Sequence, residues 1–304
     1  VDFNFKVKSS AMKMLKSKNE KKANLRFLFY TMKNIRYVPV DHTRQWIEKY
    51  SKFRVPLPPL PIQQEIVRIL DKFTDLTTDL TTDLTTELTA RRKQYEYYRD
   101  LLLTFGDEVE WKTLGSISIN TYSGGTPQAN NPEYYGGDIP WLRTQEIRFV
   151  DIYDTEMRIT QAALENSAAK WIPENCVIIA ISGATAGRCA INKIPLTTNQ
   201  HCCCLEIDPK QANYRYVFYW VSSQYEQLKS LGQGARSDLN SGIIKRYPIP
   251  IPPIEEQERI VAILDRFDVL YNDLTSSLTA EIETLQKQYE YYRDKLLSFK
   301  EVSA

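Results

Sequence analysis

The chain has 304 residues, of which 42% are hydrophobic and 25% charged, and its formal net charge is +1. This composition is typical of a globular protein and argues against a disordered chain. No uninterrupted apolar run reaches the roughly 20 residues that a membrane-spanning helix needs, so we expect a cytoplasmic protein with no membrane partner. The five cysteines agree, because their odd number and their spacing match no disulfide framework.

The first segment of the chain is rich in basic residues. Eight lysines and arginines lie among the first 26 residues, opposed only by Asp2 and Glu20. Such a run can contact the phosphates of a nucleic acid. A solvated protein surface explains it equally well.

An internal repeat organises the sequence. Residues 55–73, VPLPPLPIQQEIVRILDKF, return as residues 249–267, IPIPPIEEQERIVAILDRF. Residues 93–100 and 287–294 are both KQYEYYRD, at the same offset. Because chance does not produce two gapless matches at one offset, the chain contains two copies of one structural element.

Each copy begins with a proline-rich extended segment and is predicted to continue as a long helix. No helix can run through the prolines, which lack an amide donor and restrict the preceding residue. Beyond them, apolar residues recur at steps of four and three, the spacing of a coiled-coil seam along which two helices pack. The predicted seam comprises Ile66, Phe73, Leu80, Leu84, Leu88, Ile260, Phe267, Leu274 and Ile282, and the same spacing includes Ile62, Ile69, Leu76, Ile263 and Leu270.

The two predicted helices need a partner for their apolar stripe. Each can extend about 60 Å at 1.5 Å per residue, because neither is interrupted by glycine or proline beyond its first turn. An antiparallel pair formed by the two copies is the simplest intramolecular arrangement. The alternative is that the same seam joins two molecules of the chain.

Four-residue repeats lie within the first predicted helix. DLTT occurs at residues 75–78, 79–82 and 83–86, ELTA follows at 87–90, and a decayed version begins at Asp273. Threonine is a mediocre helix former, so packing of the leucines has to stabilise this segment. Four residues advance a helix by about 400°, so the apolar stripe should drift by about 40° per tetrad. The tetrads are either a simple spacer or a device that sets a distance.

Residues 107–247 are predicted to form a mixed α/β domain. Residues 177–181 and 202–207 are typical of buried strands, and residues 214–228 are expected to form one helix with an aromatic face. The fold class is therefore α+β, in which mixed α/β domains are joined by two long helices packed as an antiparallel coiled coil. The predicted boundaries are 1–54, 55–105, 106–248 and 249–304.

The first 54 residues resemble the end of that mixed domain. Residues 24–30, NLRFLFY, match residues 213–219, NYRYVFY, at a similar distance before the prolines. A counterpart of Trp111 would lie before Val1. We therefore expect the chain to carry only the C-terminal portion of a first domain.

Three short motifs suggest chemistry that their residues do not support. Residues 131–134, NPEY, resemble the Asn-Pro-Pro-aromatic turn of amino-methyltransferases, but Glu133 replaces the second proline, so a plain turn is expected. Residues 182–188 lack the spacing and the lysine of a phosphate-binding loop. Residues 201–204, HCCC, alternate between the two faces of a strand and cannot converge on one zinc ion.

The sequence resembles the specificity subunits of type I restriction–modification systems over its whole length. Each supporting motif is weak alone, but their order and the flanking duplicated helices are specific. The motifs are Trp111, 114–115, 123–127, 132–135, 139–142, 172–173, 183–187, 199–200, 250–253, Gln257 and 260–261.

The resemblance implies two target-recognition domains held apart by the paired helices, each of which reads one half of a split site in double-stranded DNA. It also implies a chain without a catalytic site, metal or cofactor of its own. Two modification subunits would supply S-adenosylmethionine, and restriction subunits would supply chemistry that depends on ATP and magnesium. The alternatives are a truncated half subunit that pairs with itself or binds the modification subunit without full recognition, and, less favoured, a free-standing methyltransferase.

Reading bases in a DNA groove requires hydrogen-bonding side chains on well-positioned loops. The competing interpretation of each such residue is an ordinary exposed polar side chain. The candidates in the complete domain are Thr126, Gln128, Arg143, Thr144, Gln145, Arg148, Arg188, Gln200 and Arg236.

Overall fold

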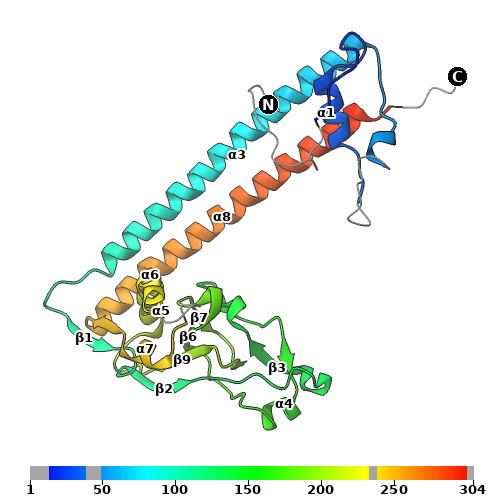
Figure 1. The fold of residues 1–304 in the computed structure, drawn as a ribbon. Coiled ribbons are helices and arrows are strands. Elements are labelled where there is room, and N and C mark those ends of the chain that lie inside the picture. Colours follow the sequence, from blue (N-terminus) through cyan, green and yellow to red (C-terminus); the bar gives the residue numbers. More distant parts are fainter. Residues whose placement is uncertain (1–13, 39–48, 233–237, 300–304) are drawn as a thin grey trace. The chain divides into compact units, whose positions relative to one another are not determined.

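The computed structural model describes residues 14–38, 49–232 and 238–299. The chain divides into two compact units, a smaller one formed by residues 1–90 and 273–304 and a larger one formed by residues 91–272. The long helices α3 (Leu60–Leu102) and α8 (Ile254–Leu297) each contribute one part to each unit (Figure 1). The predicted boundaries lie before α3, after α3 and before α8, whereas the compact units divide within these helices.

The larger unit contains three sheets. Its five-stranded sheet has the order β2-β9-β6-β7-β4 and is antiparallel except at β7-β4. A three-stranded sheet has the order β5-β3-β8, and β1 pairs with β10. The strands are β1 (Glu110–Thr113), β2 (Ser118–Tyr122), β3 (Tyr135–Leu142), β4 (Asp151–Ile152), β5 (Arg158–Ile159), β6 (Val177–Ala180), β7 (Cys189–Asn192), β8 (Thr197–Thr198), β9 (Cys202–Ile207) and β10 (Pro248–Ile251). The strands predicted at 177–181 and 202–207 are therefore confirmed.

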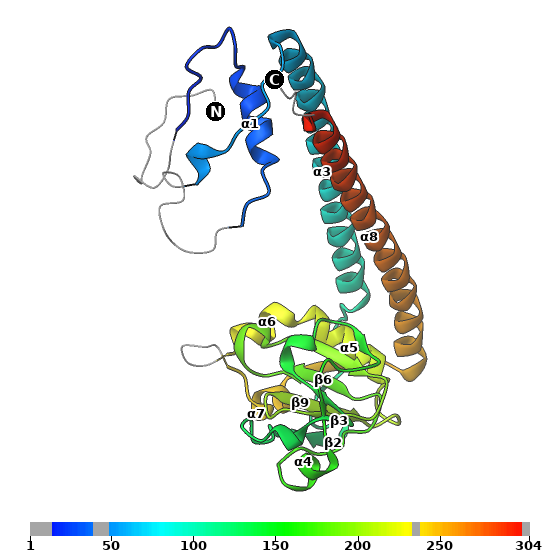
Figure 2. The same cartoon turned by 90° about the vertical axis from the view of Figure 1, so that its right-hand side faces the viewer.

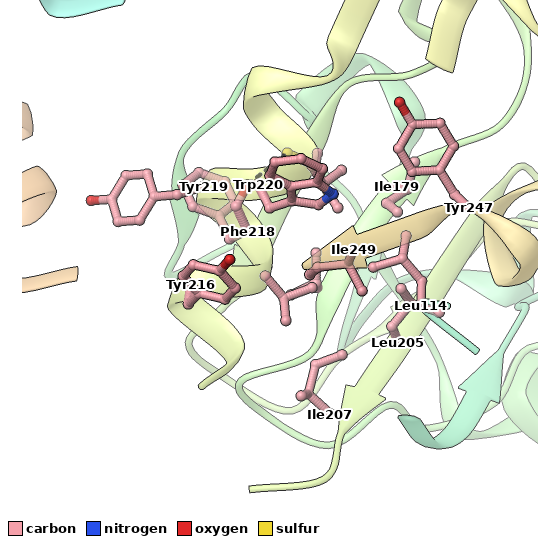
Figure 3. Close-up of a cluster of buried hydrophobic side chains, with 14 of the residues drawn as sticks. Leu114, Ile179, Leu205, Ile207, Tyr216, Phe218, Tyr219, Trp220, Tyr247 and Ile249 are labelled. Atoms are coloured by element: carbon pink, nitrogen blue, oxygen red, sulfur yellow. Dashed lines mark hydrogen bonds between the residues drawn. The ribbon is translucent and has the colours of Figure 1, made fainter. Parts of the chain in front are cut away.

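Alternation along the central strands builds two cores, one on each face of the five-stranded sheet. Ile179 and Leu205 point toward α5 (Tyr214–Ser223), together with the aromatic residues of that helix (Figure 3). Ile178 and Cys204 point to the opposite face, where they pack against Leu142 and Ile172. Helix α4 (Gln161–Glu165) packs with β3 and β5 in a separate cluster (Figure 2).

The single helix predicted at residues 214–228 is wrong, because the chain forms two helices there. Helix α5 ends at Ser223 and α6 (Tyr225–Ser230) follows. Gln224 between them leaves the helical conformation at φ −90° and ψ 14°. Its Oε1 accepts a hydrogen bond from the Tyr247 hydroxyl at 3.1 Å, a tertiary contact that the local apolar pattern does not reveal. The remaining short helices are α7 (Ser241–Arg246), η1 (Tyr50–Lys52), η2 (Pro132–Tyr134), η3 (Thr144–Glu146) and η4 (Gly183–Thr185).

The smaller unit repeats, around helix α1 (Leu25–Lys33), contacts that the larger unit makes around α5. In the smaller unit, Phe27 and Tyr30 are buried against Ile66, Leu70 and Leu297. In the larger unit, the corresponding Tyr216, Tyr219, Ile260, Leu264 and Leu103 are buried in one core. The sequence match between residues 24–30 and 213–219 thus extends to tertiary structure.

The long helices pair antiparallel within each unit. In the smaller unit the rings of Phe73 and Tyr292 stack with centroids 5.6 Å apart. In the larger unit the equivalent rings of Phe267 and Tyr98 stack at 6.0 Å. In both units a residue early in one helix meets a residue late in the other, which confirms the predicted antiparallel coiled coil and the α+β fold class.

The predicted phase of the apolar stripe is partly wrong. Leu76 and Leu270 are exposed, although they follow the predicted spacing, whereas Leu70 and Leu264 are buried. The first turns of α3 pack on α1 and on the end of α8, and the first turns of α8 pack on α5 and on the end of α3. This additional packing shifts the buried stripe. Of the predicted seam residues, Ile66 and Ile260 are buried, Phe73 is exposed but stacked, and Leu80, Leu84, Leu88, Phe267, Leu274 and Ile282 are half-buried.

Leu278 was not among the predicted seam residues, yet it is only 8% exposed, whereas Leu270 on the same helix is 65% exposed. We expect Leu278→Asp to destabilise the chain by about 3–5 kcal/mol, because it removes a buried leucine and places a carboxylate in its site. Leu270→Asp should change stability by less than about 0.5 kcal/mol. Urea denaturation followed by circular dichroism measures both, and equal midpoints would show that α8 does not bury this stripe.

Candidate nucleic-acid interface

Two parallel strands of the larger unit end side by side and direct their loops to one edge. β3 and β8 pair in the register Trp141↔Thr197 and Leu142↔Thr198. The backbone amide of Asn199 then donates to the Leu142 carbonyl at 3.2 Å. Because parallel strands end at the same edge, the loop at residues 143–148 lies beside the loop at residues 199–201. These two loops carry five of the predicted DNA-binding residues: Arg143, Thr144, Gln145, Arg148 and Gln200.

A glycine-containing loop at residues 123–128 joins this edge. The Gly125 amide donates to the Thr198 carbonyl at 2.9 Å, and the Thr126 hydroxyl donates to Gln200 Oε1 at 2.6 Å. The Trp141 indole donates to the Gly125 carbonyl at 3.1 Å and so ties the loop to β3. Thr126 and Gln128 are exposed, so two more predicted residues lie at the same edge.

The turn at residues 183–188 completes the group of loops. The Ile181 amide donates to the His201 carbonyl at 2.9 Å, and the Ala180 amide donates to the Arg188 carbonyl at 2.9 Å. The Phe149 amide donates to the Cys189 carbonyl at 2.9 Å, which holds the loop of Arg148 beside Arg188. The structure therefore links the loops of eight predicted residues through backbone hydrogen bonds. The ninth, Arg236, lies outside the described residues.

The arginines of this edge differ in availability. Arg143 donates from its guanidinium to Glu156 at 2.8 Å and from its backbone amide to Glu146 at 3.0 Å. Its charge is therefore engaged within the protein. Arg148 is exposed, and within the part of the chain that the structure describes its guanidinium donates only to the Gln145 carbonyl, at 3.0 Å. Arg188 is half-exposed, and no residue in the described ranges pairs with its guanidinium. Arg148 and Arg188 are thus the cations best placed to meet a phosphate or a base.

The motifs that resemble other chemistry are occupied by structural contacts. Asn131 Oδ1 accepts from the Glu133 amide at 3.1 Å and caps η2, so its side chain holds a turn. At the glycine loop, the Gly183 amide donates to Asp238 Oδ1 at 3.0 Å. A carboxylate in this position disfavours a phosphate group.

The consecutive thiols lie on both faces of β9, as the sequence predicts. Cys202 and Cys204 belong to one core and Cys203 to the other. Burial raises the pKa of Cys202 to about 12 and that of Cys203 to about 11, so both thiols stay protonated at neutral pH. Across the described ranges, no group of three or more residues could hold a metal ion.

The sequence analysis included Asn199 in a family motif but gave its side chain no role, and the structure shows that this side chain shapes the loop after β8. Asn199 Oδ1 accepts from the His201 amide at 3.0 Å and so turns the chain at Gln200. The available signal was an asparagine directly after a strand, because asparagine side chains often cap such turns.

Comparison with known proteins agrees with this arrangement. The model of the type I restriction modification DNA specificity domain matches residues 2–90 and 107–284. The chain belongs to this family. It is 42% identical over 317 residues to the EcoR124I/EcoR124II type I restriction enzyme specificity subunit of Escherichia coli, and the match covers 98% of this chain and 77% of that subunit. The resemblance inferred from the sequence is therefore confirmed, and DNA sequence recognition is the function of the family.

Two solved structures are similar in fold. A chain from a structure of the type I R-M system gives a TM-score of 0.69 at 16% identity and covers 92% of this chain and 72% of its own length. The HsdS subunit from Thermoanaerobacter tengcongensis gives a TM-score of 0.53 at 16% identity, with coverages of 90% and 69%. Among the helices described for this specificity subunit, none is long and apolar enough to cross a membrane.

Gly124 allows the glycine loop to approach β8 closely. A Cβ at this position would lie 1.8 Å from the Thr198 carbonyl oxygen, so the backbone has to move to accept it. We expect Gly124→Ala to cost about 1–3 kcal/mol and to separate Thr126 from Gln200. Gly242→Ala in α7 is the control, since the nearest atom to its Cβ would be a side-chain oxygen, Asn240 Oδ1, at 3.0 Å rather than a backbone atom at 1.8 Å. The midpoints of urea denaturation measure the stability of both variants, and equal midpoints would contradict the close approach of Gly124 to β8.

Proposed function

We propose that the larger unit reads one half of a split site in double-stranded DNA with the loops at residues 123–128, 143–148, 183–188 and 199–201. The observation that carries this proposal is the linkage of these four loops by backbone hydrogen bonds at one edge. They present amide, hydroxyl and guanidinium groups, which are the donors and acceptors that base edges in the major groove recognise. Arg143 acts within this surface by fixing the loop after β3, through Glu146 and Glu156.

Arg148 and Arg188 should contribute most of the charge that this edge offers to DNA. We expect Arg188→Ala and Arg148→Ala each to weaken DNA binding, by about 1–3 kcal/mol for a lost bidentate base contact. If the lost contact is to a phosphate, the plot of log affinity against log salt concentration should become shallower by about 0.9 in slope. Arg259→Ala is the matched control, because Arg259 pairs with Glu256 on the exposed face of α8. Fluorescence anisotropy of the complex with the modification subunit, over a range of salt concentrations, measures both effects. Wild-type affinity and slope in both loop variants would refute the assignment.

The chain is further proposed to scaffold two modification subunits, with restriction subunits joining the same assembly. Support comes from exposed large apolar residues that recur at equivalent positions of the repeat in each unit. Exposed apolar patches commonly mark protein interfaces, and two equivalent patches fit two copies of one partner. The equivalent exposed pairs are Leu76 and Leu270, Tyr291 and Tyr97, and Tyr292 and Tyr98.

Methyl transfer is assigned to the modification subunits, which would bring S-adenosylmethionine, and restriction chemistry with ATP and magnesium is assigned to the restriction subunits. We expect the purified chain to transfer no methyl group to DNA, since Asn131 is committed to capping a turn and cannot hold a target amine. Addition of the modification subunit should produce transfer, followed with radiolabelled S-adenosylmethionine. Transfer by the chain alone, at a rate that the modification subunit does not change, would contradict the assignment.

The tetrads of α3 are proposed to set the gap between the half-sites. The hydroxyls of Thr78, Thr82 and Thr86 each donate to the carbonyl four residues earlier, at 2.7, 2.8 and 2.8 Å. Each of these hydroxyls is therefore satisfied by a carbonyl of the preceding turn of the helix. This regularity lets whole tetrads be added or removed without leaving an unpaired hydroxyl.

Deletion of residues 79–82 should shorten α3 by about 6 Å and rotate the C-terminal remainder of the helix by about 40°. One base pair rises about 3.4 Å and turns about 35°, so the rotation matches about one base pair and the shortening about two. In a subunit with its first domain restored, we therefore expect the preferred gap to change by one or two base pairs. The bases read in each half-site should stay the same. Mapping of methylated adenines with the complex of this restored subunit tests the prediction, and either an unchanged gap or altered half-site bases would leave the tetrads as packing alone.

A further inference from the structure

Arg215 on α5 lies at the centre of a charged cluster that joins three elements of the larger unit. Its Nε donates to Asp265 of α8 at 2.9 Å, and its NH1 donates to Asp151 of β4 at 2.9 Å. The Tyr219 hydroxyl donates to Asp265 at 2.6 Å and lies 2.8 Å from Asp268 Oδ2. We call these five residues the Arg215 cluster. The side chains of Arg215 and Asp151 are only 21% and 22% exposed, so solvent weakens their ion pair little.

The smaller unit contains a simpler version of this cluster. Arg26 pairs with Asp71 at 2.8 Å, and the Tyr30 hydroxyl donates to Asp71 at 2.5 Å. Within the described ranges, Asp71 is the only carboxylate that pairs with Arg26, and Thr74 stands where the larger unit has Asp268. The simpler version already docks α1 on α3. In the larger unit, Asp151 adds a carboxylate from β4 to the same type of contact.

Asp151 lies three residues after Arg148, at the end of a tightly held segment. Phe149 has a positive φ of 61°, which is costly for an aromatic residue, and its amide donates to the Cys189 carbonyl. The Phe149 ring packs edge-on against Tyr225 with centroids 5.4 Å apart. The Ile191 amide donates to the Val150 carbonyl at 3.2 Å. A short and rigid route thus connects the loop of Arg148 to Asp151, Arg215 and α8.

The charge distribution makes Arg215 hard to replace. Burial lowers the pKa of its guanidinium, but hydrogen bonds with Asp265 and Tyr219 outweigh this and raise the pKa, so the cation is retained. Burial also raises the pKa of Asp268, whereas hydrogen bonds from Tyr95 and Tyr219 oppose that shift. One cation therefore serves three carboxylates. The planar guanidinium can bond two of them from different elements at once, which a lysine ammonium does less well.

We propose that the Arg215 cluster is a positioning device, which holds the loop at residues 143–148 in a fixed orientation to α8 and so keeps the half-site that this loop reads at the gap length that the long helices set. This inference rests on the proposed function. In this proposal Arg215 and Asp151 do not contact DNA themselves. They act through the loop at residues 143–148, which does. Loosening the cluster should therefore weaken the preference for one gap length and leave the bases that are read unchanged.

The positioning role is tested first without DNA or partner, by distance measurement between spin labels in the full chain. Tyr153, which is 68% exposed, and Glu258, which is exposed, are replaced by cysteine and labelled, since all five native thiols are buried. Asp151→Ala and Arg215→Lys should broaden the distance distribution about twofold, because a supporting contact is lost. The matched control is Asp154→Ala, which removes an exposed ion pair with Arg158 on the same segment. Thermal melts confirm that each variant is folded, and an unchanged width in both cluster variants would overturn the proposal.

The effect on the gap is tested with an assembled complex in which the specificity chain carries a restored first domain, on a DNA library in which the half-sites stand at every gap length. For Asp151→Ala and Arg215→Lys, the ratio of methylation at the preferred gap to that at neighbouring gaps should fall about tenfold. The half-site bases should stay as in the wild type. Broadened distances with an unchanged gap preference would overturn the link between the cluster and the gap. If the wild-type complex methylates no split site, the proposed function fails, while the distance measurement still decides whether the cluster positions the loop.

Discussion

A buried glutamine at the start of each long helix holds the repeated element together. Gln257 Oε1 accepts from the Asn213 amide at 2.9 Å, and its Nε2 donates to the Pro252 carbonyl at 2.8 Å. Gln63 makes the equivalent bonds to Asn24 and Pro58, at 2.8 and 2.6 Å. Both side chains are fully buried, so a lost partner would leave an unsatisfied polar group that costs about 1–3 kcal/mol. These bonds fix the proline-rich segment, the start of the helix and the packing helix in one geometry.

That geometry explains why each unit keeps an exposed apolar face. The first turns of α3 and α8 use their buried side for α1 and α5, and the paired helix uses the adjacent side. Leu76 and Leu270 then lie on a third side, which neither neighbour covers. Within each unit the paired helices bury one stripe against each other, and the exposed apolar residues beyond it support the proposal that a partner binds there.

The sequence predicts the repeat, the helix pair and the two central strands, because each rests on a period or an identity that one segment displays alone. The predicted position of the apolar stripe on the long helices was partly wrong, because their first turns also pack on α1 and α5. Gln63 and Gln257 are buried in that packing but are polar, so they do not enter an apolar pattern. The break at Gln224 and the contact of Asp151 with Arg215 join residues distant in the chain, so no local pattern reveals them. The DNA-facing residues were chosen by type alone, and parallel pairing of β3 with β8 is what links their loops.

Charge limits how this interface can work. The chain has a net charge of +1, and Arg143, Arg158 and Arg215 are paired with carboxylates inside the larger unit. Affinity from phosphate contacts grows with the number of cations that meet the backbone, and Arg148 and Arg188 offer this edge only a small share. We infer that most of the affinity comes from the partner subunits, which the exposed helix faces would hold beside the DNA. The chain can then use its few polar loops for discrimination, and discrimination depends on how firmly those loops are held.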